Sequence, residues 1–225
     1  VAVGRYALRF ATTGHSNVVV GASAADAITT GHENVAVGFK ALITATTSCG
    51  NVAVGMCSLH NHTTGGDNNA IGMCSQFTTS TGAGNNSMGH KSMELNTTGT
   101  INVAIGEQAL RRNTTGCCNV ALGYIALCAN TTGASNVAVG RGALEKNTTS
   151  DNNVAIGLNT LQQNTTAANN TAVGGGAMYL NTTGHSNVAV GVNALDSNTT
   201  AACNVAIGME ALAAATTGHS NVAVG

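Results

Sequence analysis

The cysteines, histidines and carboxylates are the residues of this sequence that could do chemistry. Among the seven cysteines, Cys57 and Cys74 occupy equivalent positions in consecutive copies of a 17-residue repeat. If the copies stack as hydrogen-bonded strands do, the two Cα atoms lie about 5 Å apart, within the range that a disulfide requires. The sequence therefore predicts a disulfide candidate at Cys57 and Cys74, with small apolar packing as the alternative role for the cysteines.

Catalytic and metal sites need unlike groups that converge on one point, and a linear repeat works against convergence. His15, His32 and Cys49 share one slot in three successive copies, but side chains in a straight row do not form the tetrahedron that zinc prefers. Carboxylates such as Glu94 and Glu145 are scattered over variable slots. We therefore expect no catalytic residue, no cofactor, no metal and no enzymatic activity.

The repeat itself must position all of these residues. The glycine that ends the pattern Asn-Val-Ala-Val-Gly recurs every 17 residues from Gly4 to Gly225 without a slip. An asparagine begins each pattern, and identical amides that stack at strand spacing can hydrogen-bond along a column. The predicted asparagine ladder includes Asn102, Asn119, Asn136, Asn153, Asn170, Asn187 and Asn204.

Two aliphatic columns are the predicted core. One column is the third residue after the asparagine, from Val20 to Ile207. The first residue after the asparagine lies two positions earlier and faces the same side of a strand. The other is the leucine of the segment that follows the glycine, which relaxes to Gln76 once. The nearly constant alanine between the two valines is expected to pack closely against a neighbouring coil or a second chain. We expect the copies between residues 69 and 94 to be the loosest.

The repeat closes with Asn-Thr-Thr-Gly, which predicts a second short strand because threonine is β-branched. Its second threonine forms a candidate Thr face, comprising Thr98, Thr115, Thr132, Thr149, Thr166, Thr183 and Thr200. Its asparagine reads as an Asn-x-Thr glycosylation acceptor if the protein is a secreted eukaryotic one. These acceptors are Asn96, Asn113, Asn130, Asn147, Asn164, Asn181 and Asn198.

These columns predict an all-β fold, because no stretch has the apolar periodicity of a helix. Each copy forms one coil of a parallel β-solenoid, and residues 1–225 make a single repeat array of about 13 coils. The chain begins and ends inside repeats, so we expect a fragment of a longer protein. Its open ends predict self-association, such as an end-to-end filament.

The unit Asn-Val-Ala-Val-Gly-x-x-Ala-Leu-x-x-Asn-Thr-Thr-Gly resembles the repeats of phage tail-fibre-domain proteins, and its Val-Ala-Ile-Gly-x-x-Ala part is similar to trimeric autotransporter adhesin heads. The resemblance covers the whole chain. It implies a left-handed parallel β-roll and a homotrimer, in an extracellular, cell-surface or virion-appendage location. The repeat here is longer than that of the adhesin heads by the Asn-Thr-Thr portion.

Composition narrows the function further. Charged residues make up 8% of the chain, with a net charge of -1, so nucleic acid has no basic surface to bind. No apolar run reaches the length of a membrane span. The first hypothesis is a non-enzymatic structural or adhesive fibre segment that contacts a cell surface or glycan through the variable slots after each glycine. The alternative is an ice-binding solenoid that uses stacked threonines.

Overall fold

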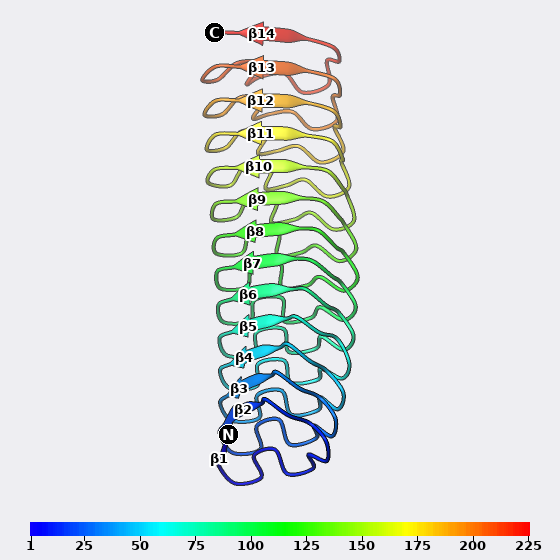
Figure 1. The fold of residues 1–225 in the computed structure, drawn as a ribbon. Helices are drawn as coiled ribbons and strands as arrows, with labels where there is room; N and C mark the ends of the chain where they lie inside the picture. The colour runs from blue at the N-terminus through cyan, green and yellow to red at the C-terminus, as the bar shows by residue number, and fades with distance from the viewer. The chain divides into compact units, whose positions relative to one another are not determined.

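The computed structural model describes all 225 residues, and the chain divides into two compact units, Val1–Thr115 and Gly116–Gly225. Each unit is a parallel β-solenoid with one short strand in each 17-residue coil and no helix. Figure 1 shows the strands of each unit stacked one above another along one side of the coils. The predicted fold class, a β-solenoid of about 13 coils, is confirmed.

The strands are two or three residues long. The first unit contains β1 (Ala2–Val3), β2 (Val18–Val20), β3 (Val35–Val37), β4 (Val52–Val54), β5 (Asn69–Ile71), β6 (Asn86–Met88) and β7 (Val103–Ile105). The second contains β8 (Val120–Leu122), β9 (Val137–Val139), β10 (Val154–Ile156), β11 (Thr171–Val173), β12 (Val188–Val190), β13 (Val205–Ile207) and β14 (Val222–Val224). Equivalent residues of neighbouring strands lie level, as Val137 and Val154 do. None of the chain forms a helix long and apolar enough to span a membrane.

The inner face of each strand is formed by its middle residue, which corrects the predicted core. Ala36 and Ala53 are fully buried and cluster with Leu42 and Leu59 of the following turns. The third strand residues, from Val20 to Ile207, point outward, and so do the first. The prediction was wrong because a thin coil has room for one large side chain per layer, and the leucine fills that room. The alanine column packs inside its own coil.

The leucine column is buried, as predicted. Leu110, Leu127 and Leu144 have no exposed surface, and each adopts the left-handed backbone region, with φ between 50° and 53°. That conformation costs a non-glycine residue about 1–3 kcal/mol. Full burial of a leucine side chain contributes about the same amount in the opposite direction.

The glycine after each strand is required by two features at once. Gly157 has a φ of 136°, which L side chains rarely adopt. A Cβ added to Gly157 would lie 2.7 Å from the carbonyl carbon and oxygen of Gly174 in the next coil. The same close approach recurs at Gly38 and Gly55, so the spacing between coils excludes every other residue type from this column.

The Asn-Thr-Thr-Gly segment forms a bend, which corrects the predicted second strand. The amides of Thr97, Thr98 and Gly99 all donate to the carbonyl oxygen of Thr114, at 3.0, 3.1 and 3.2 Å. In a regular parallel ladder each carbonyl accepts from one residue of the neighbouring strand. The convergence of three donors on one oxygen turns the chain sharply instead of extending it.

Candidate interaction surfaces

The predicted asparagine column lies inside the coils as a hydrogen-bonded ladder in each unit. The side-chain amide of Asn153 donates to Asn136 Oδ1 at 3.2 Å and to the Ala167 carbonyl at 2.9 Å. Its own Oδ1 accepts the backbone amide of Asn170 at 3.0 Å. All seven predicted members of the ladder are fully buried. Each asparagine therefore joins its coil to both neighbours.

The seven predicted glycosylation acceptors form a second internal ladder. Asn164 Nδ2 donates to Asn147 Oδ1 at 3.0 Å, and Asn181 Nδ2 donates to Asn164 Oδ1 at 2.9 Å. Glycan attachment needs an accessible side-chain amide, so the glycosylation prediction is wrong for the folded coils. The fully buried acceptors are Asn96, Asn113, Asn130, Asn147, Asn164, Asn181 and Asn198. Sequence reasoning missed this ladder, although Ile28 at the equivalent slot indicated an inward position.

The two threonine columns have different roles. The first threonine of each pair is tied to the next coil, since Thr148 Oγ1 donates to the Thr165 carbonyl at 3.1 Å and Thr165 Oγ1 to the Thr182 carbonyl at 3.3 Å. The second threonine is exposed, and its hydroxyl makes no hydrogen bond within the chain. The candidate Thr face is therefore one exposed column, formed by Thr98, Thr115, Thr132, Thr149, Thr166, Thr183 and Thr200.

The outer side of each strand presents two columns of mainly aliphatic residues, which we call the sheet face: the first and third residues of β1–β14, with Val1 completing the first coil. Its members are half-buried or exposed, as with Ile105 (44% exposed) and Ile156 (39% exposed). No charged residue occurs in either column. Contiguous exposed apolar surface of this kind marks interaction sites on proteins.

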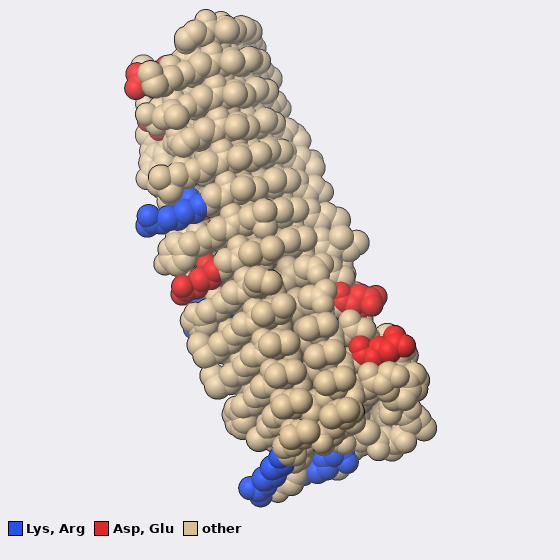
Figure 2. Space-filling model, turned by 60° about the vertical axis from the view of Figure 1, so that its left-hand side comes forward, with Lys and Arg blue, Asp and Glu red and all other residues tan.

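Charged side chains are few, and several of them pair between neighbouring coils. Arg111 Nε lies 2.6 Å from Glu94 Oε2, and Arg9 Nη2 lies 2.9 Å from Asp26 Oδ2. In the view of Figure 2 the charged side chains stand as separate groups on a largely uncharged surface. The charged side chains therefore lie outside the sheet face, which stays neutral.

Cys57 and Cys74 lie in adjacent coils of the first unit as free, half-buried thiols. Their amides make equivalent bonds, since Cys57 donates to the Phe39 carbonyl and Cys74 to the Met56 carbonyl, both at 3.0 Å. Burial raises the pKa of the Cys74 thiol, and the neighbouring Cys57 raises it further. The structure thus brings the two predicted partners into adjacent coils, and the raised pKa favours the protonated form of the Cys74 thiol.

The histidine row does not build a metal site. The rings of His15 and His32 stack in parallel, with centroids 5.0 Å apart and an interplanar angle of 7°. The nitrogen lone pairs therefore lie in two parallel planes and do not converge on a common centre. No group of three or more histidine, cysteine or acidic side chains in the chain could hold a metal ion.

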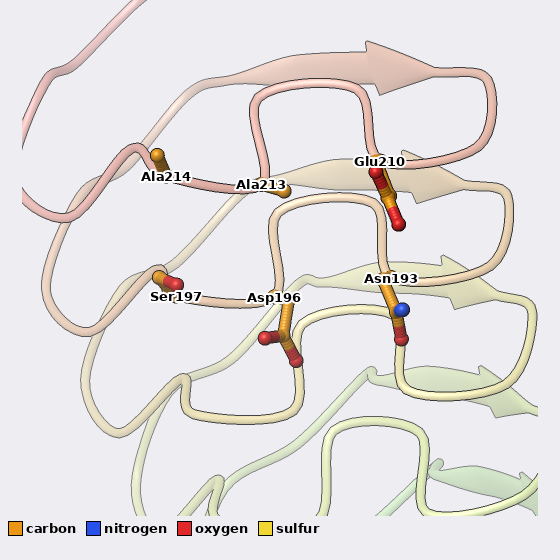
Figure 3. Close-up of a pocket in the computed structure, with 6 residues that line it drawn as sticks. All are labelled: Asn193, Asp196, Ser197, Glu210, Ala213 and Ala214. Atoms are coloured by element: carbon orange, nitrogen blue, oxygen red, sulfur yellow. The ribbon is translucent and has the colours of Figure 1, made fainter.

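A shallow hollow in the second unit contains the nearest approach to an acidic site. It lies between the coils after β12 and β13 and is lined by Asn193, Asp196, Ser197 and Glu210, with two alanines. Figure 3 shows the carboxylate of Glu210 directed toward the coil that carries Asn193. Partial burial raises the pKa of Asp196. The hollow is wide open to solvent, unlike the concave pockets that bind small ligands.

The interior of the first unit contains a polar inclusion at β5 and β6, in the region expected to be loosest. Gln76, which replaces the core leucine, donates to Ser87 Oγ at 2.9 Å and to the Asn69 carbonyl at 3.0 Å. Ser87 also pairs with Ser75, at 2.6 Å between the hydroxyl oxygens. The polar substitutions in these coils therefore satisfy one another, apart from Gln76 Oε1, which has no partner.

His62 occupies the second-ladder slot in the coil before this inclusion. Its Nε2 lies 2.6 Å from the Gly65 carbonyl, while its Nδ1 is buried without a partner. Burial lowers the pKa of His62 below its usual 6.5. The imidazole is therefore held in its neutral form at neutral pH.

Comparison with known proteins gives no family assignment. No family model matches the chain, and no curated protein or solved structure is detectably similar to it. The function therefore has to be inferred from the coil and its surfaces.

Proposed function

We propose that this chain is a non-enzymatic structural segment of an extracellular or virion fibre, and that its sheet faces pack against other copies of the chain. The observation that carries the proposal is the sheet face, which is uncharged, aliphatic at most of its positions and half-buried or exposed in every coil. Hydrophobic surface gains about 25 cal/mol per Å² when it leaves water. A repeating apolar face therefore favours a partner that repeats with the same period, and another copy of the chain has that period.

The area of the sheet face matches a second copy. Each strand adds about 4.8 Å of height and three residues add about 10 Å of width, so the seven strands of each unit provide about 350 Å² and the two units together about 700 Å² per copy. Specific protein interfaces bury about 600–1,000 Å² per partner. The absence of charge from both columns removes the repulsion that would otherwise arise when two identical faces meet.

The repeat pattern supports the setting of the proposal. Its resemblance to phage tail-fibre-domain repeats and adhesin heads favours a virion appendage or a cell surface, and a homotrimer as the oligomer. Contact with a glycan or host surface falls to the two variable positions after each glycine, where Tyr124, Leu158 and Val192 are exposed. These positions change from coil to coil while the coil itself stays constant.

Sedimentation velocity of charged variants tests the self-association. Ile156→Lys with Val190→Lys places two charges on the sheet face, and Gln163→Lys with Ser197→Lys places two charges off it in the same two coils. We expect the wild type and the off-face variant to sediment as oligomers and the sheet-face variant as a monomer with an unchanged circular dichroism spectrum. A wild-type protein that is monomeric at all concentrations would refute the proposal.

A second candidate function is ice binding, favoured by the exposed threonine column with unbonded hydroxyls. Such a column repeats at about the 4.8 Å spacing of strands, a regular array for ordering water. Replacing Thr132, Thr149 and Thr166 with tyrosine should abolish thermal hysteresis if this column binds ice. A wild-type protein without thermal hysteresis at high concentration would eliminate this candidate.

A further inference from the structure

A perfectly periodic sheet face cannot define how two copies align. If every coil were identical, sliding one copy by one coil would exchange each contact for an equivalent one and would lose only the contacts at the ends. Strand register is weakly specified for the same reason wherever a sequence is uniform. Specific alignment requires positions at which the face departs from its own period.

The first strand residue departs from valine at three positions. These are Asn69 on β5, Asn86 on β6 and Thr171 on β11. Asn69 Nδ2 donates to Asn86 Oδ1 at 2.7 Å on the outer surface. This bond uses one polar atom of each side chain, so Asn69 Oδ1 and Asn86 Nδ2 can bond across an interface.

We propose that Asn69, Asn86 and Thr171 set the register of the sheet-face interface, so that copies associate in parallel with equivalent coils level. This inference rests on the self-association proposed above. In that arrangement each polar residue meets its own equivalent, and amide meets amide where the rest of the face is aliphatic. One buried asparagine per helix fixes the register of coiled coils by the same physics.

A slipped interface leaves polar groups unpaired. Sliding one copy by a single coil keeps one asparagine pair, Asn69 opposite Asn86, but places the other Asn69 opposite Val52 and the other Asn86 opposite Val103. Each buried amide without a hydrogen-bond partner lowers the association constant of the slipped arrangement by about tenfold or more. The level register avoids both mismatches.

An antiparallel arrangement matches only part of the pattern. With its axis between β5 and β6 it pairs Asn69 with Asn86 and β4 with β7, but it leaves β1–β3 without opposing strands of the first unit. The parallel level register matches every polar position with its equivalent and keeps every strand of each unit in contact.

The test is photo-crosslinking between copies of the full chain. A benzophenone amino acid replaces Leu158, an exposed residue next to the sheet face, in ¹⁵N-labelled protein mixed with unlabelled protein. Mass spectrometry of mixed-isotope crosslinks then identifies which coil of the partner lies level. We expect the yield of crosslinks to the partner's equivalent coil, the one that contains its own residue 158, to exceed the yield to either neighbouring coil by about tenfold or more.

In the variant Asn69→Val, Asn86→Val, Thr171→Val we expect the crosslinks to spread to coils 17 residues above and below. The control, Asn61→Val with Gln163→Val, changes polar to apolar residues away from the sheet face and should keep the wild-type pattern. Crosslinks to one coil in the triple variant, or to several coils in the wild type, would overturn the register proposal while leaving self-association intact. An absence of mixed-isotope crosslinks at a monomeric mass would overturn both.

Discussion

Two adjacent glycines, Gly174 and Gly175, provide a matched test of the coil geometry. Gly174 directly follows β11 with a φ of 130°, and a Cβ there would lie 2.6 Å from the carbonyl carbon of Gly191 and in contact with its oxygen. Gly175 does not have this backbone conformation, and a Cβ there would meet nothing within 4 Å. Alanine should therefore be excluded at one position and accepted at the next.

The expected magnitudes differ in sign. Gly174→Ala combines a strained φ, worth about 1–3 kcal/mol, with a backbone clash between coils, so we expect a loss of about 3 kcal/mol or more. Gly175→Ala should be neutral or stabilising by about 0.5 kcal/mol, because it reduces the freedom of the unfolded chain. Because each coil contacts only its neighbours, the loss should centre on the coils around β11 and β12.

Urea unfolding followed by far-UV circular dichroism measures the difference. For a slope of about 2 kcal/mol per molar urea, a loss of 3 kcal/mol lowers the midpoint by about 1.5 M. Hydrogen exchange of the amides near β11 and β12 locates the effect even if the two units unfold separately. Equal midpoints for the two variants, or unchanged exchange in Gly174→Ala, would show that close approach between coils does not exclude side chains from this column.

Three further predictions follow from buried groups. The pKa of folded His62 is lowered below 6.5, so the unfolded chain binds the proton first as the pH falls; the stability that this group contributes should be full above about pH 6.5 and decrease below it. His62→Asn, which introduces the residue of most coils at this slot, should remove this contribution to the pH dependence of the unfolding free energy between pH 7 and 5. An unchanged pH dependence in the variant would contradict the prediction. Asn153→Leu should lower the free energy of unfolding in urea by about 3 kcal/mol, because it leaves several buried partners unbonded. Asn221→Leu, at the exposed end of the ladder, should lower it by less than about 1 kcal/mol. Equal losses for the two variants would argue against a cooperative ladder. Oxidised glutathione should link Cys57 to Cys74, closing a 17-residue spacing that stabilises the first unit by about 3 kcal/mol; peptide mapping that finds both thiols still open to alkylation would rule out the disulfide.

Most of the fold could be predicted from the repeat period, because a 17-residue recurrence of glycine, leucine and asparagine is compatible with few architectures other than stacked coils. The direction of the strand side chains could not be read from size alone. In a Val-Ala-Val strand either the two valines or the alanine can face the interior, and large aliphatic residues usually point inward. The better indicator was the middle strand residue, which is Ala in nearly every coil and never larger than Val, as a confined interior requires.

The surfaces of the coil were harder to predict from the sequence than the coil itself. The Asn-x-Thr pattern of Asn164 matches a glycosylation acceptor and an internal ladder equally well, and only the fold shows its side chain buried. The bend at Thr97 depends on three amides that share the Thr114 carbonyl, a geometry that threonine's β-propensity does not reveal. The sheet face became visible only once the valines were found outside.

Electron cryomicroscopy of the assembled protein tests the central claim most directly, because it shows which surface of the coil is covered. We predict that copies meet through the first and third residues of their strands, with Ile105 and Ile156 buried between chains and the threonine column around Thr149 open to solvent. Assemblies joined through other surfaces, or separate single chains with these strand residues in water, would contradict the account.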